Sequence, residues 1–162
     1  VRPVCPMAST PGASGPIWGS AFRAAGKTLV GKPEISASEM AQMLQAAVLG
    51  IQHTGERSFG RGAVVGDKTL IDALIPCANA WTEKSAAGQT LEDCFTQGAR
   101  AAVDGAKSTE NIVARMGRAG TLGERSLSYP DAGAHGGCHD LEVSILSLRM
   151  KIANPSVSDT RS

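Results

Sequence analysis

The chain is organised around residues 12–19, which have the sequence Gly12-Ala13-Ser14-Gly15-Pro16-Ile17-Trp18-Gly19. Pro16 follows at the position where a helix would start, and proline is tolerated at the first helical position because its missing N–H would be unpaired there anyway. Apolar residues then recur at helical spacing, namely Ile17, Ala21, Phe22 and Ala25. The stretch predicts a glycine-rich loop and a helix N-terminus, where backbone N–H groups and the helix dipole favour an anion such as phosphate. A capped helix start without a ligand is the alternative interpretation.

Two further amphipathic helices follow. Ser36 and Glu39 have the spacing of a capping box ahead of the first. Its apolar positions are Met40, Met43, Leu44, Ala47, Val48 and Ile51. After a glycine-rich, basic segment at 55–66, Asp67 occupies an N-cap position for the second helix. The apolar positions of that helix are Leu70, Ile71, Leu74, Ile75, Ala78 and Trp81. Pro76 should kink it, because proline removes one backbone hydrogen bond.

The longest helix is expected at 91–116, with Thr90 and Asp93 as its cap and Gly117 as its end. Its inner face carries small residues that would let a neighbouring helix approach closely. That face comprises Leu91, Cys94, Phe95, Gly98, Ala101, Ala102, Gly105, Ile112 and Val113. Residues 141–152 predict one last helix, and no segment has a convincing strand pattern. The predicted fold class is therefore all-α, an antiparallel helical bundle or barrel.

Composition limits the class of protein. A length of 162 residues suits one domain. Sixteen basic and fifteen acidic side chains nearly cancel, and aromatic residues make up 4% of the chain, which argues against binding nucleic acid. No apolar run approaches the roughly 20 residues that a membrane span needs, and no basic-then-apolar leader opens the chain. Four widely spaced cysteines favour reduced thiols and a cytoplasmic location, although their even number leaves disulfides open.

Glycine-rich polar loops remain at 12–15, 60–69 and 117–133. In an up-and-down bundle the connections alternate between the two ends, so these three loops are expected to meet at one end. The side chains that they would offer to an anion are Ser14, Lys68, Thr69, Arg118 and Arg125. This combination suits a phosphate-bearing ligand.

Other motifs are rejected. Residues 23–28 imitate the end of a P-loop, but they lack its first glycine and lie late in a helix. Residues 12–15 imitate a nucleophile elbow, but Pro16 replaces the last glycine and no strand precedes it. A local cluster of potential metal ligands lies too close together for a usual zinc site, which draws on two separated pairs. It consists of His135, Cys138, His139 and Asp140. No catalytic residue and no metal ligand is assigned.

Three motifs, in this order, resemble the nucleotide-binding (L) subunit or domain of dihydroxyacetone kinases, a family that includes erythrulose-type ketose kinases. The first is Gly12–Pro16 with Gly19, and the second is Gly66–Asp72 with Leu74 and Pro76. The third is Ala114–Ala119, continuing through Leu122–Ser126 to Asp131–Gly133. Three motifs in the family's order form a far more specific match than one glycine loop.

The resemblance implies an eight-helix antiparallel barrel that binds ATP or ADP with Mg²⁺ at one end. It implies that Ala13 and Ser14 contact the phosphates, that Leu70 lines the adenine pocket, and that Arg118 completes the site. Arg61 stands where family members often carry glycine. The cofactor-binding residues implied in this way are Gly12, Ala13, Ser14, Gly15, Arg61, Thr69, Leu70, Arg118, Asp131, Ala132 and Gly133.

The chain also departs from the family. The family holds Mg²⁺ with aspartates upstream of the Gly-Ala-Ser-Gly motif, whereas the first aspartate here is Asp67. We therefore expect an N-terminally incomplete chain that lacks the metal loop and the first helices and is inactive alone. Past Gly133 the similarity fades, since residues 134–139 interpose a loop. The family's ketose-binding histidine belongs to a separate K domain.

The sequence thus predicts an irregular segment at 1–11, a nucleotide-binding helical domain at 12–153 and a polar tail at 154–162. The resemblance implies a kinase component that passes phosphate to a short-chain ketose, dihydroxyacetone or erythrulose. Its expected partners are a ketose-binding K subunit or domain and a phosphotransfer protein. Two alternatives stay open: a non-catalytic helical module that binds a nucleotide or a partner, and a purely structural helical domain.

Overall fold

A computed structural model of the chain describes residues 14–31, 34–117 and 119–136. Its helices are α1 (Ser14–Thr28), α2 (Ala37–Phe59), α3 (Ile71–Ala86) and α4 (Leu91–Ser108), followed by the 3-10 segments η2 (Thr109–Asn111) and η3 (Ala119–Ser126). These described ranges contain no strand, and the all-α prediction is confirmed. The expected segments 1–11, 141–152 and 154–162 lie outside the described residues.

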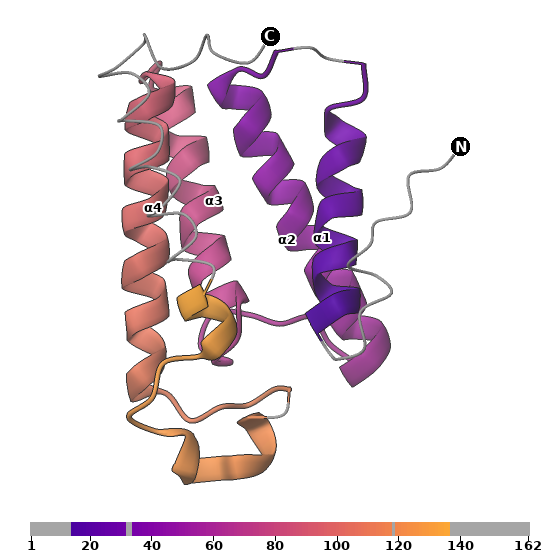
Figure 1. Ribbon diagram of the computed structural model, residues 1–162, viewed down its shortest axis with the longest axis vertical. Helices are drawn as coiled ribbons and strands as arrows, with labels where there is room; N and C mark the ends of the chain where they lie inside the picture. Colours follow the sequence, from indigo (N-terminus) through magenta and orange to yellow (C-terminus); the bar gives the residue numbers. More distant parts are fainter. Residues whose placement is uncertain (1–13, 32–33, 118, 137–162) are drawn as a thin grey trace, which may run out of the picture.

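Consecutive helices run antiparallel, and each packs against the next along the chain (Figure 1). Two clusters of buried apolar side chains fill the spaces between them. The first includes Val48, Ile51 and Ile71, and the second includes Cys77 and Trp81. Because α3 contributes to both clusters, it is buried on two faces. The predicted apolar positions lie mostly on the face in the first cluster; on the other face they include Trp81 but not Ala73 or Cys77.

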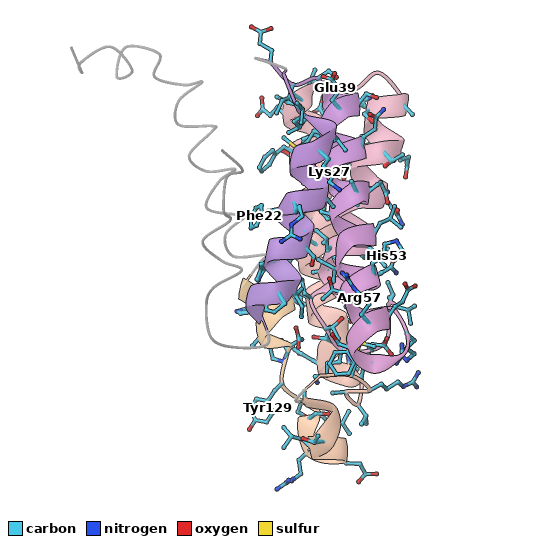
Figure 2. The ribbon with its side chains drawn as sticks, turned by 90° about the vertical axis from the view of Figure 1, so that its right-hand side faces the viewer. Phe22, Lys27, Glu39, His53, Arg57 and Tyr129 are labelled. Carbon is cyan, nitrogen blue, oxygen red and sulfur yellow. The ribbon has the colours of Figure 1, made fainter. Side chains whose placement is uncertain are left out.

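The first helix begins at Ser14, two residues before the expected start at Pro16, and the second begins with the predicted cap. Ser36 accepts a hydrogen bond from the Glu39 N–H at 3.2 Å, and the Glu39 carboxylate accepts one from the Ser36 N–H at 2.9 Å. This confirms the capping box. In α1, Ala21 and Ala25 are buried as expected, but Phe22 is 52% exposed. Figure 2 shows the Phe22 ring on the outside of the helix, where it stacks on Trp18 with 5.9 Å between ring centroids.

The second helix is longer than predicted. It continues to Phe59, so the first residues of the expected loop at 55–66 are helical. It ends at Gly60, whose φ of 77° lies in the left-handed region that glycine enters without strain. A Cβ at Gly55 would lie 3.1 Å from the carbonyl oxygen of Arg61. The chain that leaves α2 therefore folds back against the helix's last turns.

The start of α3 also differs from the prediction. Leu70 is the N-cap residue and makes no side-chain capping bond. Asp67 is therefore not the N-cap, because its carboxylate instead bonds to Arg61 and to the Val64 N–H, within the loop. Pro76 lies inside α3, which is assigned as one continuous helix. Since proline has no N–H, the carbonyl of Asp72 lacks its usual helical donor.

Small residues on α4 allow α3 to approach, as the sequence predicted. A Cβ at Gly98 would lie 2.3 Å from the Trp81 ring, and one at Gly105 would lie 2.2 Å from the Asp72 carbonyl oxygen. Both distances are far below van der Waals contact. The Trp81 indole thus packs over Gly98 and meets Phe95 edge-on, with 5.8 Å between centroids. These two glycines bring the backbones of α3 and α4 together.

The predicted helix at 91–116 is wrong in its second half. Thr90 caps the helix as expected, accepting from the Asp93 N–H at 3.1 Å. However, α4 ends at Ser108, and Ile112 has an extended backbone with φ −117° and ψ 137°. Ile112 and Val113 are therefore not on a helix face. The physical reason is tertiary: backbone groups beyond η2 bond to other loops instead of continuing the helix.

The described helices do not carry a membrane span, since none of them is long and apolar enough to cross a bilayer. Two of the four cysteines, Cys77 and Cys94, lie in this part of the chain. Both are buried.

Candidate functional site

The glycine-rich loops gather at one end of the bundle (Figure 1). The start of α1, the connection between α2 and α3, and the segment after α4 all lie at that end. The Arg115 N–H donates to the Asp67 carbonyl oxygen at 3.0 Å, which joins the second loop to the third. Ile17 and Trp18, from the first turns of α1, pack into the same cluster as Met116. Gly12 and Ala13 lie outside the described residues.

The loop before α3 is built around Asp67, which is 2% exposed. Its carboxylate accepts from both terminal nitrogens of Arg61, at 2.5 and 2.7 Å, and from the Val64 N–H at 2.9 Å. The Arg61 guanidinium, followed by the Val64 bond, holds the pKa of the Asp67 carboxyl below its usual value although burial opposes this. Arg61 was expected to contact the cofactor. In the structure its guanidinium is paired with Asp67.

A second aspartate shapes the same loop from the other side. Asp72 is fully buried, and its two carboxylate oxygens accept from the Gly66 N–H at 2.6 Å and from the Thr69 N–H at 2.7 Å. The Thr69 hydroxyl in turn accepts from the Ile71 N–H at 3.2 Å. Buried carboxylates that accept backbone N–H bonds fix the path of the main chain. Thr69 and Leu70 are thus held at the start of α3.

Lys68 does not face an anion site, contrary to the prediction. It is 3% exposed and has a φ of 60°, in the left-handed region that non-glycine residues rarely adopt. Its ammonium donates to the carbonyl oxygens of Ile112 at 3.1 Å and Ser126 at 2.5 Å. The Ser126 hydroxyl accepts from the Ala114 N–H at 2.9 Å. Lys68 therefore joins the loop before α3 to two points of the segment after α4.

The predicted residues Leu70 and Gly133 lie side by side, with room between them for about one carbon atom. A Cβ at Gly133 would lie 3.6 Å from the Leu70 Cβ and 3.1 Å from the Asp131 carboxylate. Leu70 is half-buried, whereas Ala132 and Gly133 are exposed, so small residues border an apolar side chain at the surface. The Asp131 carboxylate accepts from the Ala134 N–H at 2.9 Å, and the Asp131 N–H donates to Thr109. This turn is therefore anchored to the end of α4.

Asp131 lies close to other charges at this junction. Burial raises the pKa of the Asp131 carboxyl, and the charge of Asp72 adds to the rise. Backbone bonds from Ala134 and Gly133, and the charge of Lys68, oppose it. Two buried or half-buried carboxyls and one buried ammonium thus share the junction between the loop before α3 and the turn at 131–133.

The other residues predicted to contact an anion or the cofactor are Ser14, Gly15, Arg118 and Arg125. Ser14 and Gly15 begin α1, and Gly15 is buried. Arg118 lies outside the described residues, and Arg125 is exposed on η3. Tyr129 is 72% exposed and projects from the loop end of the molecule (Figure 2).

Sequence reasoning missed the structural roles of Asp67, Lys68 and Asp72. Their common signal was three charged residues within a glycine-flanked segment that leads directly into an apolar helix. Of the local cluster at 135–140, His135 is exposed, and Cys138, His139 and Asp140 lie outside the described residues. The described residues contain no group of three or more acidic, histidine or cysteine side chains able to hold a metal ion.

A hollow of about 410 Å³ lies elsewhere, between α2 and α3. Its lining includes Ser38, Ala41, Gln45 and Thr82. These residues belong to the beginning of α2 and the end of α3, at the end of the bundle opposite the glycine-rich loops. The hollow is therefore separate from the candidate site.

Comparison with known proteins identifies the family. Residues 5–143 match the DAK2 domain. The chain is 37% identical, over 123 residues, to an L-erythrulose kinase of Pectobacterium atrosepticum, a match that covers 76% of this chain and 20% of the relative. It is 31% identical, over 141 residues, to the ADP-binding subunit DhaL of a PEP-dependent dihydroxyacetone kinase of Listeria innocua, covering 87% of this chain and 62% of that subunit.

A third relative supports the same assignment. The corresponding DhaL subunit of Escherichia coli is 30% identical over 128 residues, with coverage of 79% of this chain and 58% of the subunit. The chain thus spans between a fifth and just under two thirds of the length of these relatives. The matched range includes every residue that the structure describes, and the chain belongs to the DAK2 domain family.

Proposed function

We propose that this chain is the nucleotide-binding domain of a ketose kinase related to the dihydroxyacetone and erythrulose kinases, and that it holds ADP or ATP at the loop end of its bundle. The observation that carries the proposal is that Leu70 and Gly133, 63 residues apart in the sequence, lie side by side. Two relatives are named as ADP-binding subunits, and a third is named as an erythrulose kinase. These names support the ligand and the class of reaction.

The residues around this pair fit a nucleotide. Leu70 offers an apolar surface suited to a flat base, and exposed Ala132 and Gly133 leave room beside it. A Cβ at Gly133 would enter this space, at 3.6 Å from the Leu70 Cβ. The N-terminus of α1, at the same end of the bundle, suits the negatively charged phosphates. The bound nucleotide would supply the transferable phosphoryl group, and these side chains would orient it.

The described residues do not fit a magnesium site. Mg²⁺ requires hard oxygen ligands in near-octahedral geometry, and no acidic cluster of the necessary size occurs among the described residues. We therefore propose that the 162 residues, assayed alone, bind a nucleotide without transferring its phosphoryl group to a ketose. The acceptor ketose and a ketose-binding K subunit or domain belong to the complete reaction.

A thermal melt of the 162-residue chain tests ligand binding. ADP at about 100 times its dissociation constant should stabilise the fold by about 2.7 kcal/mol, which corresponds to a shift of several degrees for a domain of this size. The shift should be the same with EDTA as with Mg²⁺. Leu70→Ala should weaken ADP binding, whereas the matched change Leu49→Ala, at an exposed position of α2, should not.

Each result bears on one part of the proposal. No shift with either ADP or ATP would contradict nucleotide binding. A shift that requires Mg²⁺ would contradict the proposed absence of metal ligands. Formation of ketose phosphate from ATP by the 162 residues alone, in a coupled assay, would show that the chain is catalytically complete and would overturn the second part.

A further inference from the structure

The strongest unassigned feature is the buried ammonium of Lys68. Burying a charged amine is unfavourable unless hydrogen bonds replace its water shell. Two carbonyl oxygens, those of Ile112 and Ser126, do so here. These acceptors lie 44 and 58 residues away along the chain. The Lys68 side chain therefore joins three segments far apart in the sequence, in addition to the backbone bond from the Arg115 N–H to the Asp67 carbonyl.

The backbone of the loop also fixes the direction of the Lys68 side chain. The residue adopts a left-handed φ of 60°, which L side chains rarely enter. Asp67 and Thr69 on either side are both fixed by hydrogen bonds, through Arg61 and Asp72 respectively. The loop thus directs the Lys68 side chain into the interior, toward the Ile112 and Ser126 carbonyls. A lysine used only to attract an anion would instead project into solvent.

We propose that Lys68 is a positioning residue for nucleotide binding: its ammonium sets the distance between the Thr69–Leu70 side of the site and the segment 112–126. The inference rests on the proposed function, because it assigns a role within that site. The Ser126 hydroxyl, which bonds to the Ala114 N–H and the Gly123 carbonyl, holds the acceptor segment in shape. Lys68 need not touch the ligand to act in this way.

Lys68→Met removes the ammonium and keeps the length of the side chain. Without the two hydrogen bonds, the loop before α3 and the segment after α4 are joined less firmly, since the bond from the Arg115 N–H to the Asp67 carbonyl remains, and ADP must order them on binding. We expect the dissociation constant for ADP to rise at least tenfold, measured by titration calorimetry well below the melting temperature. Lys107→Met, at an exposed position in the last turn of α4, is the matched control and should leave the affinity unchanged within twofold.

Rescue with an amine separates positioning from a purely structural role. Lys68→Ala leaves space for a small cation, so ethylammonium chloride should restore at least part of the ADP affinity, whereas sodium chloride at equal ionic strength should not. A structural role alone would lower the melting temperature and leave the dissociation constant of the folded protein unchanged. That result in Lys68→Met would overturn the proposal.

The outcomes remain distinct from those of the proposed function. If the unmodified chain does not bind ADP, the proposed function fails, whatever Lys68 does. If the unmodified chain binds ADP and Lys68→Met binds it equally well, only the role of Lys68 fails. Should Lys68→Met not melt cooperatively, Ser126→Ala serves instead, with an expected loss of affinity of at least threefold; unchanged affinity in that variant overturns the proposal.

Discussion

Arg61 and Asp67 form a two-point ion pair within the loop between α2 and α3, with nitrogen–oxygen distances of 2.5 and 2.7 Å. The Asp67 side chain is 3% exposed, whereas that of Arg61 is 46% exposed. The pair therefore places a partly solvated guanidinium over a buried carboxylate. Because the same carboxylate also accepts from the Val64 N–H, it holds the loop in one conformation.

Asp67 should make the protein sensitive to acid. Arg61 and the Val64 N–H lower the pKa of Asp67 below the unfolded value of about 3.9. The unfolded chain therefore binds more protons in this window, and the contribution of Asp67 is lost as pH falls below about 4 through the folded pKa. Asp67→Asn should lose less stability than the unmodified protein between about pH 4 and pH 2. Urea midpoints measured across that range give the comparison, and equal slopes for the two proteins would contradict it.

The pH dependence of stability that Asp131 contributes should have the opposite sign to that of Asp67. Burial raises the pKa of Asp131, so the folded state retains its proton to a higher pH than the unfolded chain does. Its contribution therefore decreases as pH rises from about 4, the unfolded value, through the folded pKa. Asp131→Asn, whose amide oxygen can still accept from the Ala134 N–H, should be more stable than the unmodified chain at pH 7, and this advantage should disappear near pH 3. Equal stability at both pH values would count against it.

The close approach of α3 and α4 depends on Gly105. A Cβ there would lie 2.2 Å from the backbone carbonyl oxygen of Asp72, and no rotamer change can relieve a contact with backbone. Gly105→Ala should therefore destabilise the fold by about 1–3 kcal/mol in urea unfolding. Gly26→Ala is the matched control, because a Cβ in that part of α1 meets nothing within 4 Å. It should stabilise the protein by about 0.5–1 kcal/mol. Similar effects at both positions would refute the close packing.

The N-terminus of α2 provides a local test. Ser36→Ala removes the hydroxyl that accepts from the Glu39 N–H and should cost about 1 kcal/mol of stability. Glu39→Gln retains a side-chain oxygen for the Ser36 N–H and should have a smaller effect. Chemical unfolding of the two variants in parallel measures the difference. A larger loss of stability for Glu39→Gln than for Ser36→Ala would contradict the prediction.

The features that the sequence predicted correctly depend on short separations along the chain. Ser36 and Glu39 at one helix start, and Thr90 and Asp93 at another, are three residues apart. Apolar residues at helical intervals predicted buried positions of α2 and most of one face of α3, together with Trp81 on its other face. Helix caps and amphipathic faces are local, so their residue types and spacing are sufficient to identify them. The family was identified from three such motifs.

The tertiary structure alone decided the roles of Asp67 and Lys68 and the end of α4. Lys68 was expected to face an anion, yet it bonds to carbonyl groups 44 and 58 residues away. The helix expected to reach residue 116 ends at Ser108, because the Ala114 and Arg115 N–H groups bond to Ser126 and Asp67 instead. Helical propensity contributes only tenths of a kcal/mol per residue, so hydrogen bonds between distant loops can override it. The spacing of residue types along the chain does not predict hydrogen bonds between such distant segments.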